Sequence, residues 1–144
     1  MKGKLSGSIF WALVGIFVVI ASVIAIPAFR EYLSFPSIAI SGGVFFLLGV
    51  ALIFSTVKEK VGGMLKKFLI LTGASSAGFF VFVFLHNAIY GLFIHWFGVG
   101  FWDRIGLGDE PFFFIIAVFL CPAAFSVGAI GSIVFTIKKF RMAK

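Results

Sequence analysis

The sequence predicts an all-α integral membrane protein in which four transmembrane helices form an up-down bundle, with the N and C termini in the cytoplasm. Three observations lead to this fold class: 62% of the 144 residues are hydrophobic, only 12% are charged, and the mean hydropathy is +1.21. A soluble domain carries about 25% charged residues to keep its surface hydrated. We therefore expect hydrocarbon rather than water around most of this single transmembrane domain, residues 1–144.

The first predicted span covers residues 8–29, an uncharged run bounded by Lys4 and Arg30. As a helix it reaches about 33 Å, which is enough for a hydrocarbon core of about 30 Å. The run exceeds the apolar core of a secretory leader, roughly 7–15 residues, so we expect a retained helix. Residues 37–57 form the second span, and Pro36 helps to separate it from the first.

The third predicted span, residues 68–97, belongs to an uncharged run that is too long for one perpendicular crossing. Either the helix continues past the bilayer to Phe97, or it ends near Gly91 and residues 91–108 lie along the outer membrane surface. The aromatic side chains of that segment suit the headgroup layer, where amphipathic rings settle. Residues 111–137 form the fourth span.

The distribution of basic residues predicts the orientation. Ten of the 12 Lys and Arg residues flank one set of helix ends, and only Arg30 and Arg104 flank the other. Short loops rich in Lys and Arg stay in the cytoplasm, which places both termini there and the protein in the cell (plasma) membrane. The net charge is +7, but the basic residues that cause it flank the apolar runs, as they do in the cytoplasmic loops of membrane proteins. We therefore expect the lipid bilayer as a partner and no nucleic acid.

Six polar residues of the third span fall on one arc of about 120° when successive residues are placed 100° apart. Polar side chains avoid lipid, so this arc should face other helices or a wet cavity. One interpretation is an outer-leaflet binding or catalytic site for a lipophilic ligand, a quinone or a lipid. The other, which we favour, is an interhelical hydrogen-bond cluster. The six residues are Thr72, Ser75, Ser76, His86, Asn87 and Tyr90.

Small side chains form strips along three of the predicted spans. In the fourth span their spacing is typical of close helix packing, and Pro122 should kink that helix and release the carbonyl of Val118. On the first span, Ser8, Ala12, Gly15 and Ser22 share one face. The predicted helix-packing positions are Ala117, Ala124, Gly128, Gly131 and Ser132 on the fourth span and Ala74 and Gly78 on the third.

The sequence contains no complete catalytic or cofactor motif, so we assign no metal and no cofactor. His86 and His95 are nine residues apart and point in opposite directions, so they cannot hold one haem within a chain. On the outer side His95, Asp103, Asp109 and Glu110 are the only plausible acid–base set for an external enzyme, and they could in principle bind a metal. Their spacing matches no ligand motif.

These observations predict a small multi-pass membrane protein that acts as a non-catalytic subunit or scaffold and packs against itself, as a homo-oligomer, or against a larger membrane complex. The lipophilic-ligand site is the alternative. A second alternative is an oligomeric channel or carrier lined by the polar arc, although no Asp, Glu, Lys or Arg lies within any predicted span.

Overall fold

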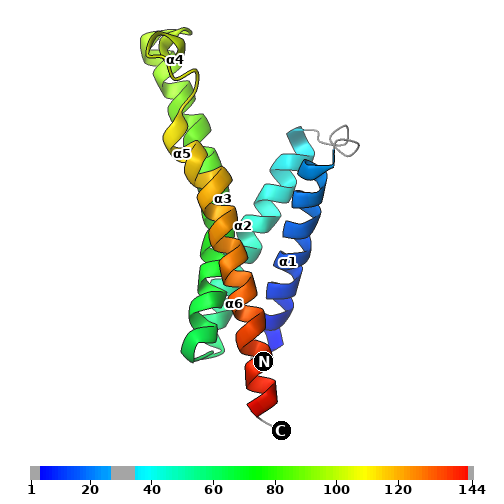
Figure 1. The fold of residues 1–144 in the computed structure, drawn as a ribbon. Helices are drawn as coiled ribbons and strands as arrows, with labels where there is room; N and C mark the ends of the chain where they lie inside the picture. Colours follow the sequence, from blue (N-terminus) through cyan, green and yellow to red (C-terminus); the bar gives the residue numbers. More distant parts are fainter. Residues whose placement is uncertain (1–3, 27–34, 143–144) are drawn as a thin grey trace.

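A computed structural model describes residues 4–26 and 35–142, and all the regular elements within them are helical (Figure 1). Four helical stretches in this part of the chain are long and apolar enough to cross a membrane, as the sequence predicted. The elements are α1 (Lys4–Ala25), α2 (Phe35–Lys58), α3 (Gly63–Phe97), α4 (Phe101–Arg104), α5 (Pro111–Ile115), the π-helical turn η2 (Ile116–Leu120) and α6 (Cys121–Met142).

The helix ends differ from the predicted spans where charged residues continue a helix beyond its apolar part. α3 starts at Gly63, five residues before the predicted boundary, because Lys66 and Lys67 occupy helical positions. It ends at Phe97, where Gly98 adopts a φ of 89° that glycine tolerates. Of the two alternatives for this helix, the longer one is therefore observed. The last residues of the first predicted span, 27–29, lie outside the described residues.

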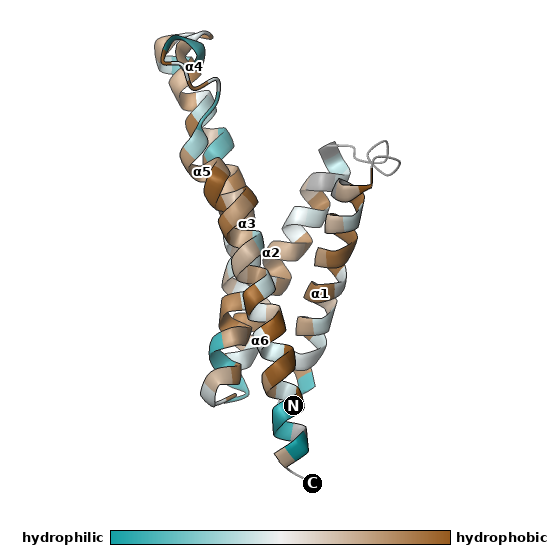
Figure 2. Ribbon diagram, in the orientation of Figure 1, coloured by the Kyte–Doolittle hydropathy of each residue, from teal (hydrophilic) through white to brown (hydrophobic). Residues whose placement is uncertain are grey.

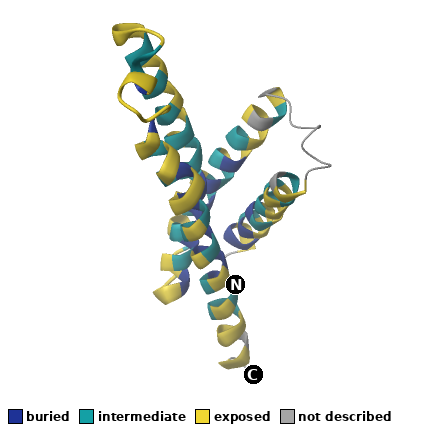
Figure 3. Cartoon of the chain, turned by 45° about the horizontal axis from the view of Figure 1, so that its top comes forward, coloured by how far each residue is buried: buried dark blue, intermediate teal, exposed yellow. Residues whose placement is uncertain are grey.

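The four long helices form two pairs that meet at the lower end of the molecule and diverge at the upper end (Figure 1). α1 packs on α2, α2 packs on α3, and α3 packs along α6. Both chain ends lie at the lower end (Figure 1). The main apolar core takes two residues from each long helix, and Figure 3 shows the buried residues gathered where the helices converge. These core residues are Phe10, Leu13, Phe45, Leu52, Leu65, Leu69, Phe125 and Ala129.

Hydrophilic residues gather at the two ends of the molecule, and hydrophobic residues occupy the middle of each long helix (Figure 2). At the lower end, Glu59 follows α2 and reaches the start of α1. Its carboxylate accepts hydrogen bonds from the backbone amides of Leu5 and Ser6, at 3.1 and 3.0 Å, and from the Ser6 hydroxyl. The first turn of a helix leaves such amides without partners, so Glu59 joins the α2–α3 turn to the start of α1.

The turn η2 directly precedes Pro122 and accommodates it. Proline has no N–H and disrupts the regular hydrogen-bond pattern of an α-helix. Here the amide of Cys121 bonds to the carbonyl of Ile116, five residues earlier. The predicted disturbance around Pro122 therefore takes the form of one wide helical turn, and the helix continues to Met142.

Candidate functional site

The lower part of the polar arc of α3 lies inside the bundle. Thr72, Ser75 and Ser76 are all buried. The hydroxyls of Thr72 and Ser75 donate to carbonyls one turn earlier in α3, at 2.9 and 2.7 Å. The Ser76 hydroxyl instead donates to the backbone carbonyl of Phe45, at 2.6 Å, and so links α3 to α2. These three hydroxyls are thus bound to the backbone of the protein itself.

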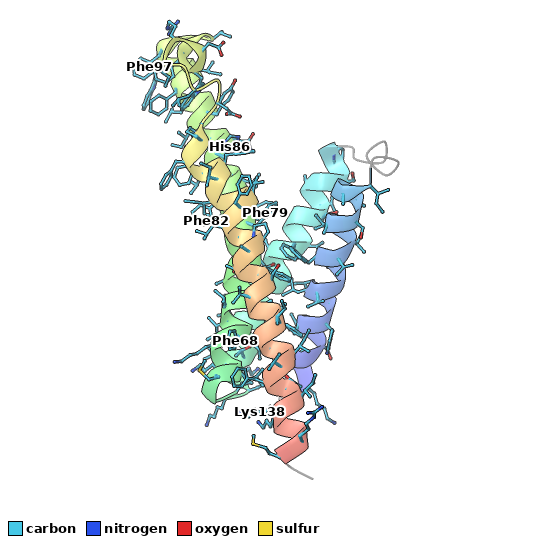
Figure 4. The ribbon with its side chains drawn as sticks, viewed as in Figure 1. Phe68, Phe79, Phe82, His86, Phe97 and Lys138 are labelled. Atoms are coloured by element: carbon cyan, nitrogen blue, oxygen red, sulfur yellow. The ribbon has the colours of Figure 1, made fainter. Side chains whose placement is uncertain are left out.

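The upper part of the arc centres on His86, which meets the loop residues before α5 (Figure 4). Its Nδ1 lies 3.0 Å from the carbonyl oxygen of Glu110 and 3.3 Å from the carboxylate of the same residue. Both of those atoms are acceptors, so Nδ1 carries a proton. The other ring nitrogen, Nε2, lies 3.7 Å from the Asp109 carboxylate. His86 therefore connects α3 to the start of the last helical run.

Glu110 has a second role as the N-cap of α5. Its carboxylate accepts hydrogen bonds from the amides of Phe112 and Phe113 at 2.8 to 3.2 Å, and Pro111 occupies the first helical position. A carboxylate in this place satisfies amides that lack helical partners and interacts favourably with the helix dipole. Glu110 is only 4% exposed, so the cap and the His86 contact together compensate for its burial.

In the described part of the chain, the side chains of Asn87 and Tyr90 form no hydrogen bond to another helix. The Asn87 amide is exposed and donates to the carbonyl of Val83 in its own helix, at 2.8 Å. The Tyr90 ring lies 6.5 Å from the His86 ring and stacks on Trp102 of α4 at 5.9 Å. Trp102 is buried, and its indole N–H donates to the Tyr90 carbonyl, at 3.2 Å. α4 thus folds back onto the end of α3.

Two of the outer acidic residues, Asp109 and Glu110, lie beside His86 rather than forming a set with His95. Asp109 and Glu110 both approach the His86 ring from the loop before α5. Among the described residues, no three His, Cys, Asp or Glu side chains are grouped so that they could hold a metal ion. The sequence had not indicated a partner for His86, because Glu110 follows it by 24 residues and joins it only through the fold.

Small residues on α6 allow it to approach α3 closely. A Cβ atom added to Gly128 would lie 2.6 Å from the Thr72 hydroxyl and 2.8 Å from the Thr72 amide. At Gly131 an added Cβ would overlap the ring of Phe68. These two glycines therefore permit the packing of α6 on α3.

The other predicted packing residues differ in their surroundings. Ala117 and Ser132 are buried, Ala124 is half-buried, and Ala74 is exposed. Gly78 is half-buried, and an added Cβ there would lie in ordinary contact with the Cys121 sulfur, at 3.6 Å. The face of α3 that carries Ala74 is therefore not covered by another part of the described chain.

A close crossing of α2 and α3 involves two glycines that do not belong to the predicted strips of small residues. A Cβ added to Gly73 of α3 would lie 2.7 Å from the carbonyl oxygen of Gly49, and one added to Gly49 would lie 2.7 Å from the carbonyl oxygen of Gly73. The contact is reciprocal, so each backbone occupies the place that a side chain of the other would need. A search for small residues repeated along one helix does not find a crossing built from one glycine on each helix.

An apolar cavity of about 380 Å³ lies between α1, α2, α3 and the last helical run and is partly open. Its walls include Phe17 and Ala21 of α1, Phe79 of α3, and Cys121 and Phe125 of α6. We call it the lateral cavity.

No protein-family model, curated protein or solved structure matches this chain.

Proposed function

We propose that this chain is a non-catalytic subunit or scaffold of the plasma membrane that packs against a second copy or a larger membrane complex. In this proposal the four long helices cross the bilayer alternately up and down, with the lower end of the molecule in the cytoplasm. The basic residues around Lys58, Lys66 and Lys138 support this orientation, because positive loops are retained on the cytoplasmic side.

The observation that carries the proposal is the outward face of α1. Three of the four residues of its predicted small strip, Ser8, Ala12 and Gly15, are exposed, and the fourth, Ser22, is half-buried. An added Cβ at Gly15 would meet no atom within 4 Å. The Ser8 and Ser22 hydroxyls donate to carbonyls of their own helix, which leaves this face nearly apolar. Small side chains let another helix approach closely in lipid. On α6 the comparable strip is already covered by α3, whereas on α1 it remains free for a partner helix.

The use of the polar arc supports a structural role as well. The Ser76 hydroxyl and the His86 ring hold α3 to α2 and to the loop before α5. The Thr72, Ser75 and Asn87 side chains bond to the backbone of α3 itself. These contacts favour the interhelical cluster over a ligand site among the same residues.

The length of α3 supports an outer segment in the headgroup layer. A helix of 35 residues reaches about 52 Å, roughly 20 Å more than the hydrocarbon core. The part beyond the core exposes Trp96, Phe97 and Val99. A tilt of up to about 40° reduces the length of α3 that extends beyond the hydrocarbon core. The part that still extends beyond it lies in the headgroup layer, where aromatic rings are favoured.

Cysteine crosslinking in native membranes tests the proposal. In a Cys121→Ser background, Gly15→Cys places a thiol on the outward face of α1, and Leu47→Cys places one on an exposed face of α2 as the matched control. We expect oxidation to give a covalent dimer, or an adduct with one larger partner, at Gly15→Cys only. Equal yields at the two positions, or no adduct at position 15, would contradict the proposed interface.

A further inference from the structure

We propose that the lateral cavity holds one acyl chain of a phospholipid from the leaflet at the upper end of the molecule. This inference requires that the helices cross a bilayer, and it does not require the subunit role or the interface on α1. The chemistry of the walls is the first argument. They are formed almost entirely by apolar atoms of α1, α2, α3, η2 and α6, and the one polar side chain among them, Ser75, donates to the Leu71 carbonyl.

The depth of the cavity is the second argument. Ala21 and Phe17 lie in the upper half of α1, and Cys121 lies in the upper half of the last helical run. At this depth the medium outside the protein is lipid tails, and the cavity is partly open. A polar or aqueous occupant would lose its hydrogen bonds among these walls, whereas a hydrocarbon chain would not.

The volume of the cavity is comparable with one lipid tail. A methylene group needs about as much room as a water molecule, roughly 30 Å³, so the cavity of about 380 Å³ has room for about 12 methylenes. This is comparable with one acyl chain of a phospholipid.

A polar rim lies above the cavity on the same face of α3. Ser75, Phe79 and His86 fall within about 40° of one another around the helix, and His86 lies roughly 10 Å above Phe79 along the axis. Phe79 reaches the cavity, and Asp109 beside His86 is about half exposed (Figure 4). A phospholipid with one chain in the lateral cavity would thus have its polar end level with His86 and Asp109.

Counting the lipid that remains bound during purification tests the proposal. Ala21→Phe fills the cavity from α1, and Val19→Phe adds the same ring two residues away on the opposite side of that helix as the control. We expect about one phospholipid per chain in organic extracts of the wild type and of Val19→Phe. Each displaced methylene weakens binding about fourfold, so displacement of two should reduce the lipid of Ala21→Phe at least about tenfold.

A photocrosslinking experiment on the wild-type protein covers the case in which Ala21→Phe fails to fold. A phospholipid with a diazirine in one acyl chain is incorporated into vesicles with the protein, and the adducts are mapped by mass spectrometry. We expect adducts on Cys121 and Phe79 to exceed those on Val19, which faces bulk lipid at a similar depth. Equal lipid in all three proteins, fewer adducts in the cavity than on Val19, or a stoichiometric isoprenoid in place of phospholipid would overturn the proposal.

Discussion

Replacing Gly73 with alanine should separate α2 from α3 and lower the free energy of unfolding. The new Cβ would lie 2.7 Å from the Gly49 carbonyl oxygen and 2.8 Å from a side-chain carbon of Ile53. Ordinary contacts start at 3.4 Å, so one backbone must move by roughly 0.7 Å. The nearer obstacle is a backbone atom of a helix, which cannot rotate away as the end of a side chain can.

The magnitude follows from two opposing effects. Overpacking a well-packed contact costs about 1–3 kcal/mol. Alanine has a higher helix propensity than glycine, which returns up to about 1 kcal/mol at an exposed helical site and less in a buried one. We therefore expect Gly73→Ala to lose about 1–2 kcal/mol. The Ser76–Phe45 hydrogen bond lies near the same crossing and should lengthen when the helices separate.

Reversible unfolding in mixed micelles of increasing dodecyl sulfate content, followed by circular dichroism, measures this loss. Gly91→Ala is the matched control on α3, because an added Cβ there would meet no atom within 4 Å. The control should be neutral or slightly stabilising, and Gly49→Ala should destabilise as Gly73→Ala does. If Gly73→Ala unfolds at the same dodecyl sulfate fraction as Gly91→Ala, the two helices do not cross as closely as described.

Three further predictions concern the ends of the molecule. Glu110→Ala removes the N-cap of α5 and the carboxylate that lies 3.3 Å from His86, although the carbonyl of residue 110 remains as an acceptor, so it should lose at least about 1 kcal/mol in the same unfolding assay. Asp109→Ala changes a half-exposed side chain and should cost less. The hydrogen bond from the Ser6 side chain, and then that from the Ser6 backbone, lowers the pKa of Glu59 below its ordinary 4.5. Its contribution to stability is therefore complete above about pH 4.5 and is lost as the pH falls through the lowered pKa. Hydrogen exchange should show falling protection of the Ser6 amide at acidic pH in the wild type, and low protection at every pH in Glu59→Gln. Trp102→Phe removes the hydrogen bond to the Tyr90 carbonyl, and proteolysis within residues 98–110 should become faster than in Trp96→Phe, which changes an exposed ring.

The sequence predicts the helical class and the four apolar spans because both depend on local composition. Uncharged runs of sufficient length need no knowledge of their neighbours to be identified. The boundaries are less well predicted, since a count of charges locates the edge of the apolar part and not the end of the helix. Lys66 and Lys67 belong to α3 even though they end the apolar run. The stop after Phe97 depends on the backbone conformation of Gly98.

The contacts between helices could not be predicted in the same way. The polar arc on α3 follows from its periodicity, but the partner of His86 is Glu110, which lies 24 residues later and meets it only through the fold. The lateral cavity depends on how far α1 diverges from α3, which no single helix encodes. The Gly49–Gly73 crossing likewise requires the register between two helices. Pairwise geometry, rather than the character of any one segment, determines these features.

The wide turn η2 sets the rotational phase of everything above it. Five residues there occupy a place where an α-helix would use four, so the part that carries Glu110 is turned by about 100° relative to an uninterrupted α-helix. With this offset, Glu110 and Gly128 both face α3, although they lie on opposite sides of Pro122. Deleting one residue, such as Val118, should let the chain become regular and swing Glu110 away from His86. In this protein the length of a single turn decides which residues can meet near the upper end of α3.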